Sequence, residues 1–332
     1  MSSESSNKQT IGLKGPIVAI IILALAFIAF FNRQLIYDTV EYHTYKPTAT
    51  MQSFVKRTTM NGEGQFLFYS AHPELETAAQ FNKNCPTQDT SMAILGCYNG
   101  QQIFIYDIDN SKLDGIREVT AAYEMLHAAY KRLSPSDRAN LDSLIEQAYS
   151  DPSNQSLFKQ SVDYFAKTEP GERDNELFSL IATQVKTVNP KLEAYYSRYF
   201  TNRQAIVAMY NKYSSVFTQY TTQLTALEVK LQNMSDDIKT RTAQYNEDVA
   251  SVNAAIQSFN SRANSGGFSS QSEFNSDRAA LLQQVDSVNQ EQASINQEID
   301  SYNQLLQQYN QSVLATKQLY NSINSLAPAP SV

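Results

Sequence analysis

The most informative stretch of this chain is Val119-Thr120-Ala121-Ala122-Tyr123-Glu124-Met125-Leu126-His127-Ala128-Ala129-Tyr130. Read as a helix, it places Tyr123, Glu124 and His127 on adjacent turns, because residues three and four apart share one helix face. We therefore expect these three side chains to point into one cleft.

The pattern Y-E-x-x-H in this stretch differs at one position from the zinc-binding motif H-E-x-x-H. In that motif two histidines four residues apart bind Zn²⁺, and the glutamate beside the first histidine polarises the attacking water. Glu124 and His127 match the motif, whereas Tyr123 stands at the first ligand position. The spacing alone is a weak signal, since E-x-x-H occurs by chance in many chains.

A second segment, Asp174-Asn175-Glu176-Leu177-Phe178-Ser179, resembles the N-E-x-x-S segment on which gluzincin metallopeptidases carry their third zinc ligand. The layout of the chain also resembles a group of exported bacterial proteins with a signal anchor, an H-E-M-L-H helix, an N-E-L-H-S-x-x-G-T-E helix and a coiled coil. The resemblance implies an α+β fold with a small, mostly helical zincin-like domain that contains a short β-hairpin or sheet. It also implies that Glu176 lies opposite His127 as a metal ligand.

Three potential ligands of that pattern are replaced, by Tyr123, Phe178 and Gln184. Catalytic zinc takes three protein ligands, and only His127 and Glu176 remain. A tyrosine could fill the gap only as a phenolate, whose formation is costly at neutral pH because its ordinary pKa is near 10.

We therefore expect zinc binding to be weak or absent, with Glu124 as a vestigial general base. Phe178 and Gln184 are expected to pack or form hydrogen bonds inside the old cleft. Whether His72 or His43 replaces the lost ligand stays open.

The length of 332 residues favours two domains, and the charge and motifs disfavour nucleic-acid binding. The formal net charge is −7, and the chain has neither a glycine-rich phosphate loop nor a basic patch interleaved with aromatic residues.

One apolar segment, residues 15–32, is long enough for a short transmembrane helix. A signal-peptide core is the competing interpretation, but a small-x-small cleavage site is missing after it, where Ala29-Phe30-Phe31-Asn32 is bulky. We interpret it as an uncleaved signal anchor of a single-pass cell-membrane protein. Lys8 and Lys14 before the segment favour a cytoplasmic tail at 1–14 and an extracytoplasmic chain after it.

The two cysteines, Cys85 and Cys97, agree with export, because an even pair in an oxidising compartment most simply forms one disulfide. The chain-entropy estimate for such a loop is roughly 3 kcal/mol. Their spacing excludes a C-x-x-C motif.

The segment 33–200 carries the predicted metallopeptidase-like domain. Gln65–Tyr69 is a strand candidate, and Glu74–Asn82 looks helical. A hairpin is predicted from Ala93–Tyr98 and Gln101–Asp107 around Asn99-Gly100, a pair that suits a type I′ turn. Further helices are expected to start at Ser134-Pro135 and to cover 156–167, 172–186 and 192–200.

The segment 201–326 has a heptad rhythm of apolar residues, from Ile206 to Phe259 and again from Phe274 to Ile323. Folding back at a turn over 264–268 pairs positions such as Phe259 with Phe274 and Ile238 with Ile295. In this register Arg241 faces Gln292, and both arms form an antiparallel coiled-coil hairpin. The last residues, 327–332, are predicted to be disordered.

These observations favour a membrane-anchored, extracytoplasmic pseudo-metallopeptidase that binds or scaffolds components of the cell envelope. Two alternatives stay open: an active zinc-dependent endopeptidase with a substituted ligand, and a purely structural coiled-coil protein of the envelope. The expected partners are the lipid bilayer and envelope proteins or peptides, with homo-oligomers through the coiled coil as a further option.

Overall fold

The computed structural model describes residues 14–86, 89 and 91–327. The expected cytoplasmic tail, apart from Lys14, and the expected disordered tail, apart from Ala327, lie outside these residues. The chain divides into two compact units. One contains Met1–Ser215 together with Asn321–Val332, and the other contains Val216–Tyr320.

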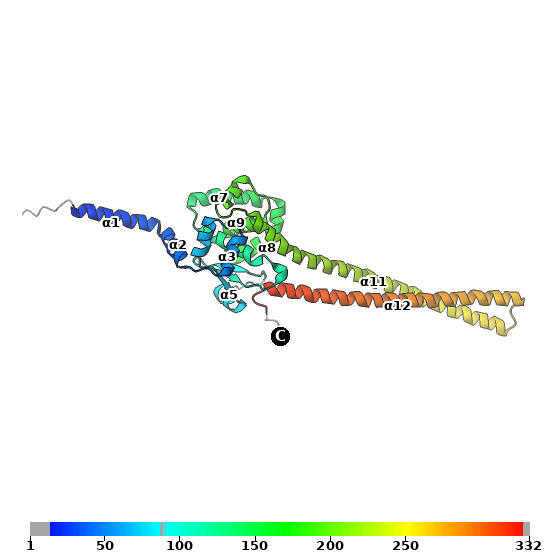
Figure 1. The fold of residues 1–332 in the computed structure, drawn as a ribbon. Coiled ribbons are helices and arrows are strands. Elements are labelled where there is room, and N and C mark those ends of the chain that lie inside the picture. Colours follow the sequence, from blue (N-terminus) through cyan, green and yellow to red (C-terminus); the bar gives the residue numbers. More distant parts are fainter. Residues whose placement is uncertain (1–13, 87–88, 90, 328–332) are drawn as a thin grey trace, which may run out of the picture. The chain divides into compact units, whose positions relative to one another are not determined.

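The first unit is mostly helical and contains one small sheet, which agrees with the predicted α+β class (Figure 1). Its helices are α1 (Lys14–Phe31), α2 (Arg33–Thr44), α3 (Ala49–Arg57), α4 (Gly62–Ser70), α5 (Ala78–Asn84), the 3₁₀ helix η1 (Ser111–Leu113), α6 (Ile116–Lys131), α7 (Pro135–Tyr149), α8 (Pro152–Thr168), α9 (Arg173–Gln184) and α10 (Pro190–Tyr196). Its strands are β1 (Glu74–Glu76), β2 (Gly96–Tyr98) and β3 (Ile103–Tyr106).

The sheet has the order β1-β3-β2, so β3 lies in the centre and β2 forms an outer strand. β2 and β3 make the predicted antiparallel hairpin, with Cys97 paired to Phe104. β1 pairs with β3 in parallel. The residues of β3 are buried from Ile103 to Ile105, as expected of a central strand between two neighbours.

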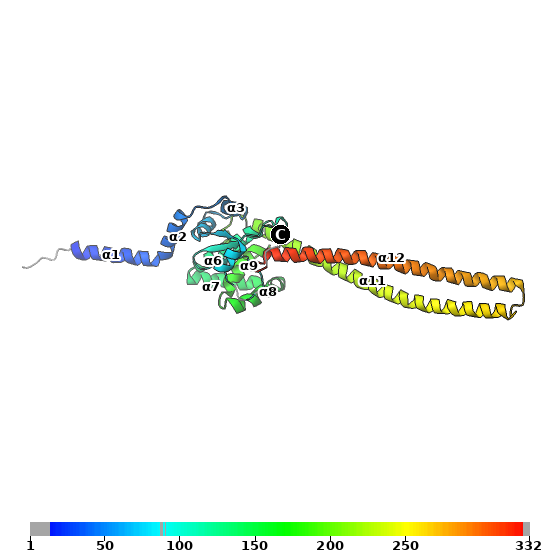
Figure 2. The same cartoon turned by 90° about the horizontal axis from the view of Figure 1, so that it is seen from below.

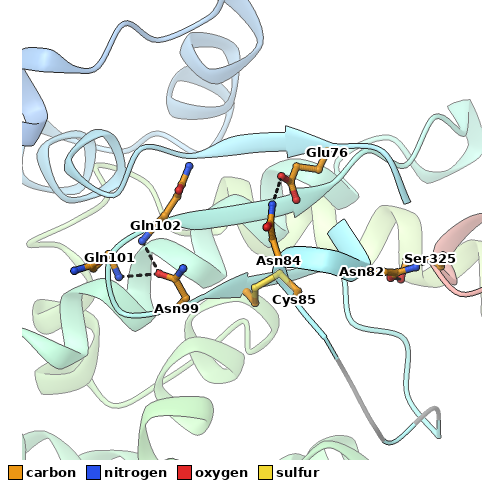
Figure 3. The surroundings of a disulfide bond; sticks show 9 residues. Glu76, Asn82, Asn84, Cys85, Asn99, Gln101, Gln102 and Ser325 are labelled. Atoms are coloured by element: carbon orange, nitrogen blue, oxygen red, sulfur yellow. Dashed lines mark hydrogen bonds between the residues drawn. A yellow bond between two sulfur atoms is a disulfide. The ribbon is translucent and has the colours of Figure 1, made fainter. Parts of the chain in front are cut away.

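The turn of this hairpin is not the predicted type I′ turn. That turn needs positive φ at both central residues, and Gly100 alone has it, at +98°. Four residues connect the paired ends Tyr98 and Ile103. The side-chain oxygen of Asn99 accepts hydrogen bonds from the backbone N–H groups of Gln101 and Gln102, which closes the longer loop (Figure 3).

The predicted strand Gln65–Tyr69 is wrong, because these residues form most of α4. Asn61 caps that helix by accepting from the N–H groups of Glu63 and Gly64. Burial of Leu67 and Phe68 in the core then outweighs the strand preference of the aromatic residues.

The predicted helix Glu74–Asn82 is wrong in its first part. Residues 74–76 form β1, since they pair with β3, and the helix α5 begins only at Ala78. The predicted helices after Ser134 occur as α7 to α10 with shifted ends. The last of them ends at Tyr196, and Phe200 instead forms a β-bridge with Met60.

The predicted disulfide between Cys85 and Cys97 is present, with the Cα atoms 6.0 Å apart (Figure 3). It joins the C-terminal end of α5 to the outer strand β2. The outer strand is therefore held by a covalent bond to α5 and by hydrogen bonds to β3.

The core of the first unit is built around α6. This helix packs against α9, α4 and the strands β2 and β3. Ala121, Ala122 and Ala129 are almost completely buried on it, and such small side chains let neighbouring elements approach closely. Helices α7 and α8 also pack against α9.

The N-terminal helices α1 and α2 meet at an angle of 70°. Within the described residues, no single helix is both long and apolar enough to cross a membrane; α1 from Val18 and α2 pass that test only as a bent pair, by length and composition. The uninterrupted span expected over 15–32 is therefore not shown. Asp38 of α2 is buried and accepts two hydrogen bonds from Arg132, which fixes α2 to the end of α6.

A buried arginine joins the start of α11 to the end of α9. Arg203 is 3% exposed, and its guanidinium donates to the carbonyl oxygens of Ala182, Val185 and Lys186. It also forms an ion pair with Glu193 of α10 at 2.6 Å. These bonds satisfy carbonyl groups that the C-terminal turn of a helix leaves without partners.

The second unit consists of two long helices, α11 (Gln204–Asn264, which begins in the first unit) and α12 (Gln271–Ile323). They run side by side in both views (Figures 1 and 2). The predicted turn is confirmed: Gly266 has a φ of +70°, and the N–H of Gly267 donates to the carbonyl of Arg262 at 2.8 Å. The rings of Phe259 and Phe274 are in contact, as the predicted register requires.

The predicted polar layer of Arg241 and Gln292 is wrong. Gln292 is exposed, and Arg241 binds Glu291, Ser294 and Glu298 of α12 instead. Arg241 is long enough to reach along the surface of the partner helix, so it avoids an uncompensated buried charge. The predicted Ile295 is buried on α12, Leu306 is half-buried, and Tyr320 contacts Phe217 of α11. Leu305 and Leu319, which the heptad pattern did not include, are buried as well.

Candidate functional site

The candidate site lies where α6 and α9 pack together. Pro170 and Gly171 separate α9 from α8, and Gly171 has a φ of +97°, a conformation that glycine adopts most readily. The chain therefore turns sharply there and returns with Glu176 in the first turns of α9, facing α6.

Three side chains of this site meet directly. The phenol of Tyr123 donates a hydrogen bond to Oε2 of Glu176. Nε2 of His127 lies 3.6 Å from Oε1 of the same carboxyl group. The rings of Tyr123 and His127 contact each other edge to face, with centroids 4.7 Å apart. The structure thus brings the predicted residues of the two helices together.

The orientation of His127 is fixed from α9. Its Nδ1 lies 3.0 Å from the side-chain oxygen of Asn175, whose amide nitrogen donates to Glu172 at 2.9 Å. Because that amide nitrogen is engaged, the oxygen faces the imidazole, and Nδ1 of His127 carries the proton. The lone pair on Nε2 then faces Glu176.

Glu124 is buried, with 3% of its surface exposed, and no donor among the described residues makes a hydrogen bond to it. Gly96 of β2 packs against it. A Cβ atom at Gly96 would lie 2.7 Å from Oε1 of Glu124 and 2.7 Å from the methyl group of Thr120. Glycine at this position thus lets β2 approach α6 directly above the carboxyl group.

A cavity of about 300 Å³ opens beside these residues. Its walls come from β2 and the segment before it, from α6, and from α8 and α9. Tyr123, Glu124, His127, Glu176 and Gln184 all line it. The cavity therefore follows the outer strand of the sheet.

Phe178 is not part of this cavity. Its ring is fully buried and stacks on Tyr196, with centroids 5.1 Å apart, so it belongs to the core. His43 and His72 do not line the cavity either. His72 instead pairs with Glu41 at 3.0 Å, and its ring packs on Tyr45.

Burial controls the protonation of the site. It lowers the pKa of His127 to about 4, so the imidazole is neutral at pH 7 and the 3.6 Å contact with Glu176 is not an ion pair. Burial also raises the pKa of Glu176 to about 7, against the hydrogen bond from Tyr123, which lowers it. The pKa of Glu124 and that of Tyr123 rise well above their ordinary values, again mainly through burial.

The donor set does not fit a catalytic zinc ion. His127 and Glu176 offer one nitrogen and one carboxylate, whereas three protein ligands are needed. Tyr123 stays protonated and donates a hydrogen bond to Glu176. It therefore occupies an oxygen of an expected ligand and adds no ligand of its own. Among the described residues, no group of three or more His, Cys, Asp or Glu could hold a metal ion.

Two acidic residues of the site, Glu169 and Glu172, lie outside the motifs used to predict it, and Asn175 lies inside one of them without a predicted role. Glu169 and Glu172 flank Pro170-Gly171, and that turn signal between two helices could have placed both carboxyl groups near Glu176. Asn175 precedes Glu176 on α9, and its role depends on a contact that sequence spacing does not show.

Comparisons of this chain with protein-family models, with curated proteins and with solved structures give no match.

Proposed function

We propose that this protein is a non-catalytic, peptide-binding relative of the gluzincin metallopeptidases, held at the outer side of a cell membrane. The observation that carries the proposal is the hydrogen bond from Tyr123 to Glu176. A phenol stands at the first ligand position and is hydrogen-bonded to the residue expected as the third ligand. His127 is then the one expected ligand that remains available to a metal ion.

The chemistry of the site supports the loss of catalysis. Hydrolysis by a zincin needs a metal-bound water and a glutamate that can accept its proton. The two remaining ligands, His127 and Glu176, do not make the three-ligand site that would hold this metal-bound water. Burial also raises the pKa of Glu124, which disfavours the charged form that a general base needs.

The outer strand β2 supports peptide binding. A strand at the edge of a sheet offers unpaired backbone N–H and C=O groups to an extended peptide. The cavity runs along β2 and the segment Met92–Leu95 before it, so side chains of a peptide added there can enter it. The disulfide and β3 hold this strand in place without a ligand.

The exported, membrane-anchored setting is part of the same proposal. Helix α1 exposes large apolar side chains along its length, from Val18 to Phe31, as an anchor in lipid would. A disulfide is typical of proteins outside the cytoplasm. The long helices α11 and α12 are then a scaffold for partners in the envelope or for other copies of this chain.

Metal binding tests the loss of catalysis. The full-length chain is purified in detergent without chelator, dialysed against zinc and then against zinc-free buffer, and its zinc content is measured. We expect far less than one zinc per chain for the wild type and a measurable rise for Tyr123→His, which restores a nitrogen ligand and releases Glu176.

Tyr123→Phe is the matched control, because it frees Glu176 without adding a ligand. Zinc in this variant should stay as low as in the wild type. One tightly held zinc per wild-type chain, or zinc-dependent cleavage of a casein substrate by the wild type, would contradict the proposal.

Peptide binding is tested with acetylated and amidated heptapeptides of random sequence. We expect the full-length chain to retain a subset of them, and to lose most of this binding when alternate peptide nitrogens are methylated, since methylation removes strand hydrogen bonds. Absence of binding by any peptide would contradict the binding part of the proposal.

A further inference from the structure

Acidic side chains are concentrated in the cavity beside α6. Four glutamates line it: Glu124, Glu169, Glu172 and Glu176. Glu169 is exposed and Glu172 is half-buried, whereas Glu124 and Glu176 are buried. Carboxyl groups therefore line the cavity from the surface to its interior.

Two of these groups have protein partners. Glu172 accepts from Asn175, and Glu176 accepts from Tyr123. Glu124 differs from them, because it is 3% exposed and makes no hydrogen bond with any described residue. Its carboxyl oxygens are not among the enclosed side-chain atoms without a hydrogen-bond partner, which belong to Glu76, Arg138 and Ser179. Glu124 lines the cavity, so its oxygens are open to a donor that enters it.

The cavity has no internal cation that could serve as this partner. Lys131 is the one lysine or arginine among the described residues that line it. Lys131 is exposed, and its charge acts on Glu169 and Glu176 rather than on Glu124. Glu124, Glu169 and Glu176 also lie close enough to repel one another when charged. The unbound cavity is therefore electrostatically suited to an incoming positive charge.

The remaining walls suit an aliphatic stem. Met92, Ile94 and Leu95 line the cavity from the segment before β2, and Phe165 and Leu180 line it from α8 and α9. Lysine and arginine side chains join an apolar stem to a cationic end, so they match walls of this kind that lead to carboxyl groups. Metal cations are a poorer match, because no metal-binding group occurs among the described residues.

We propose that the cavity receives a lysine or arginine side chain of a bound peptide, with Glu124 as the partner of its cationic group. This inference rests on the proposed peptide binding and adds the chemical class of the ligand. The stem passes between Met92, Leu95 and Leu180, and the charged end reaches Glu124 beside Gly96.

The test uses four acetylated and amidated heptapeptide libraries with the full-length chain in detergent. Six positions are random, and the central position is lysine, arginine, norleucine or citrulline. Norleucine and citrulline keep the stem but remove the charge. We expect the lysine or the arginine library to bind about tenfold more tightly than its neutral counterpart, since a buried carboxylate makes a strong charge-assisted hydrogen bond.

Glu124→Gln removes the charge while keeping the shape of the side chain, and we expect it to abolish this preference. Glu63→Gln on α4 is the matched control, because Glu63 lies outside the cavity and its loss should leave the preference intact. Thermal melting of both variants separates a lost preference from a lost fold.

The outcomes distinguish this inference from the proposed function. Equal binding of all four libraries by the wild type would overturn the inference while peptide binding stands. Absence of binding by any library would overturn both. A fifth library, with norleucine at the centre and a free N-terminus, covers one more case. If it binds more tightly than the acetylated lysine and arginine libraries, the cation is the terminal ammonium group and the inference is overturned.

Discussion

Tyr123 and Glu176 are joined by a hydrogen bond between α6 and α9, although fifty-three residues separate them in the chain. The bond closes the space between the two helices at the positions where the resemblance to gluzincins places metal ligands. It also gives a buried carboxyl group its donor, so its removal should affect stability as well as ligand chemistry.

Tyr123→Phe should destabilise the fold by roughly 1–3 kcal/mol at pH 7, because it leaves Oε2 of Glu176 buried without its donor. Urea denaturation followed by circular dichroism measures the change. Tyr37→Phe on α2 is the control, since Tyr37 is 40% exposed and should be near neutral. Equal effects of the two substitutions would show that the bond contributes nothing.

Glu176 should make stability depend on pH. Its pKa is raised from 4.5 to about 7 by burial, so its contribution is fully present below about pH 4.5 and is lost as the pH rises through 7. Glu176→Gln does not titrate and can still accept from Tyr123. Its stability relative to the wild type should therefore rise between pH 4.5 and 8 by on the order of 3 kcal/mol.

His127 acts in the opposite direction, because its pKa is lowered to about 4. Its contribution is present above pH 6.5 and is lost as the pH falls through 4. Both proteins contain His127, so its effect cancels in the difference between them. A difference that stays constant from pH 4.5 to 8 would show that Glu176 titrates normally.

Gly96→Ala should destabilise the fold by roughly 1–3 kcal/mol, because the added carbon would lie 2.7 Å from both Glu124 and Thr120. Gly62→Ala is the matched control: nothing lies within 4 Å of its added carbon. The effect of Gly96→Ala should shrink when Glu124 is also replaced by alanine, since one of the two clashing groups is gone. Additive effects in the double variant would contradict this contact.

The disulfide should stabilise the first unit by about 3 kcal/mol, as expected for a loop of this length. Urea denaturation with and without dithiothreitol measures the contribution. The variant with both Cys85→Ser and Cys97→Ser should match the reduced wild type and should not respond to the reductant. Complete alkylation of both cysteines in the non-reduced protein would show that the bond does not form.

Arg241 and Glu298 should be coupled in a double-mutant cycle of the full-length chain. Their side chains are 28% and 18% exposed and form an ion pair at 2.7 Å. The coupling should be favourable and should weaken as salt is added, because partly exposed charges are screened. The same cycle with Gln292 in place of Glu298 should show no coupling, which is the reverse of what the heptad pattern alone predicts.

The parts of the fold that were predicted correctly depend on local signals. Ser134 and Pro135 start α7 by capping, and the glycine at 266 ends α11 with positive φ. The heptad pattern of α11 is regular enough to identify its contact face. These signals need only neighbouring residues, so a single sequence contains them.

The errors occur where distant contacts decide the structure. Residues 65–69 look like a strand, but packing of Phe68 in the core makes them helical. In the second unit, Arg241 pairs with Glu298 rather than with the predicted Gln292, because the long arginine side chain reaches along the partner helix. In the site, the sequence predicted that Tyr123 and Glu176 share one cleft. It did not place Glu169 and Glu172 there, because their position depends on the turn between α8 and α9.

Arg203 has a mechanical consequence. Its bonds to Ala182, Val185 and Lys186 mean that the first turn of α11 is not attached through a slack linker. Tension applied along α11 is resisted by the last turn of α9, the helix that carries Glu176. A pull on the start of α11 is therefore transmitted to the helix that contributes Glu176 to the cavity.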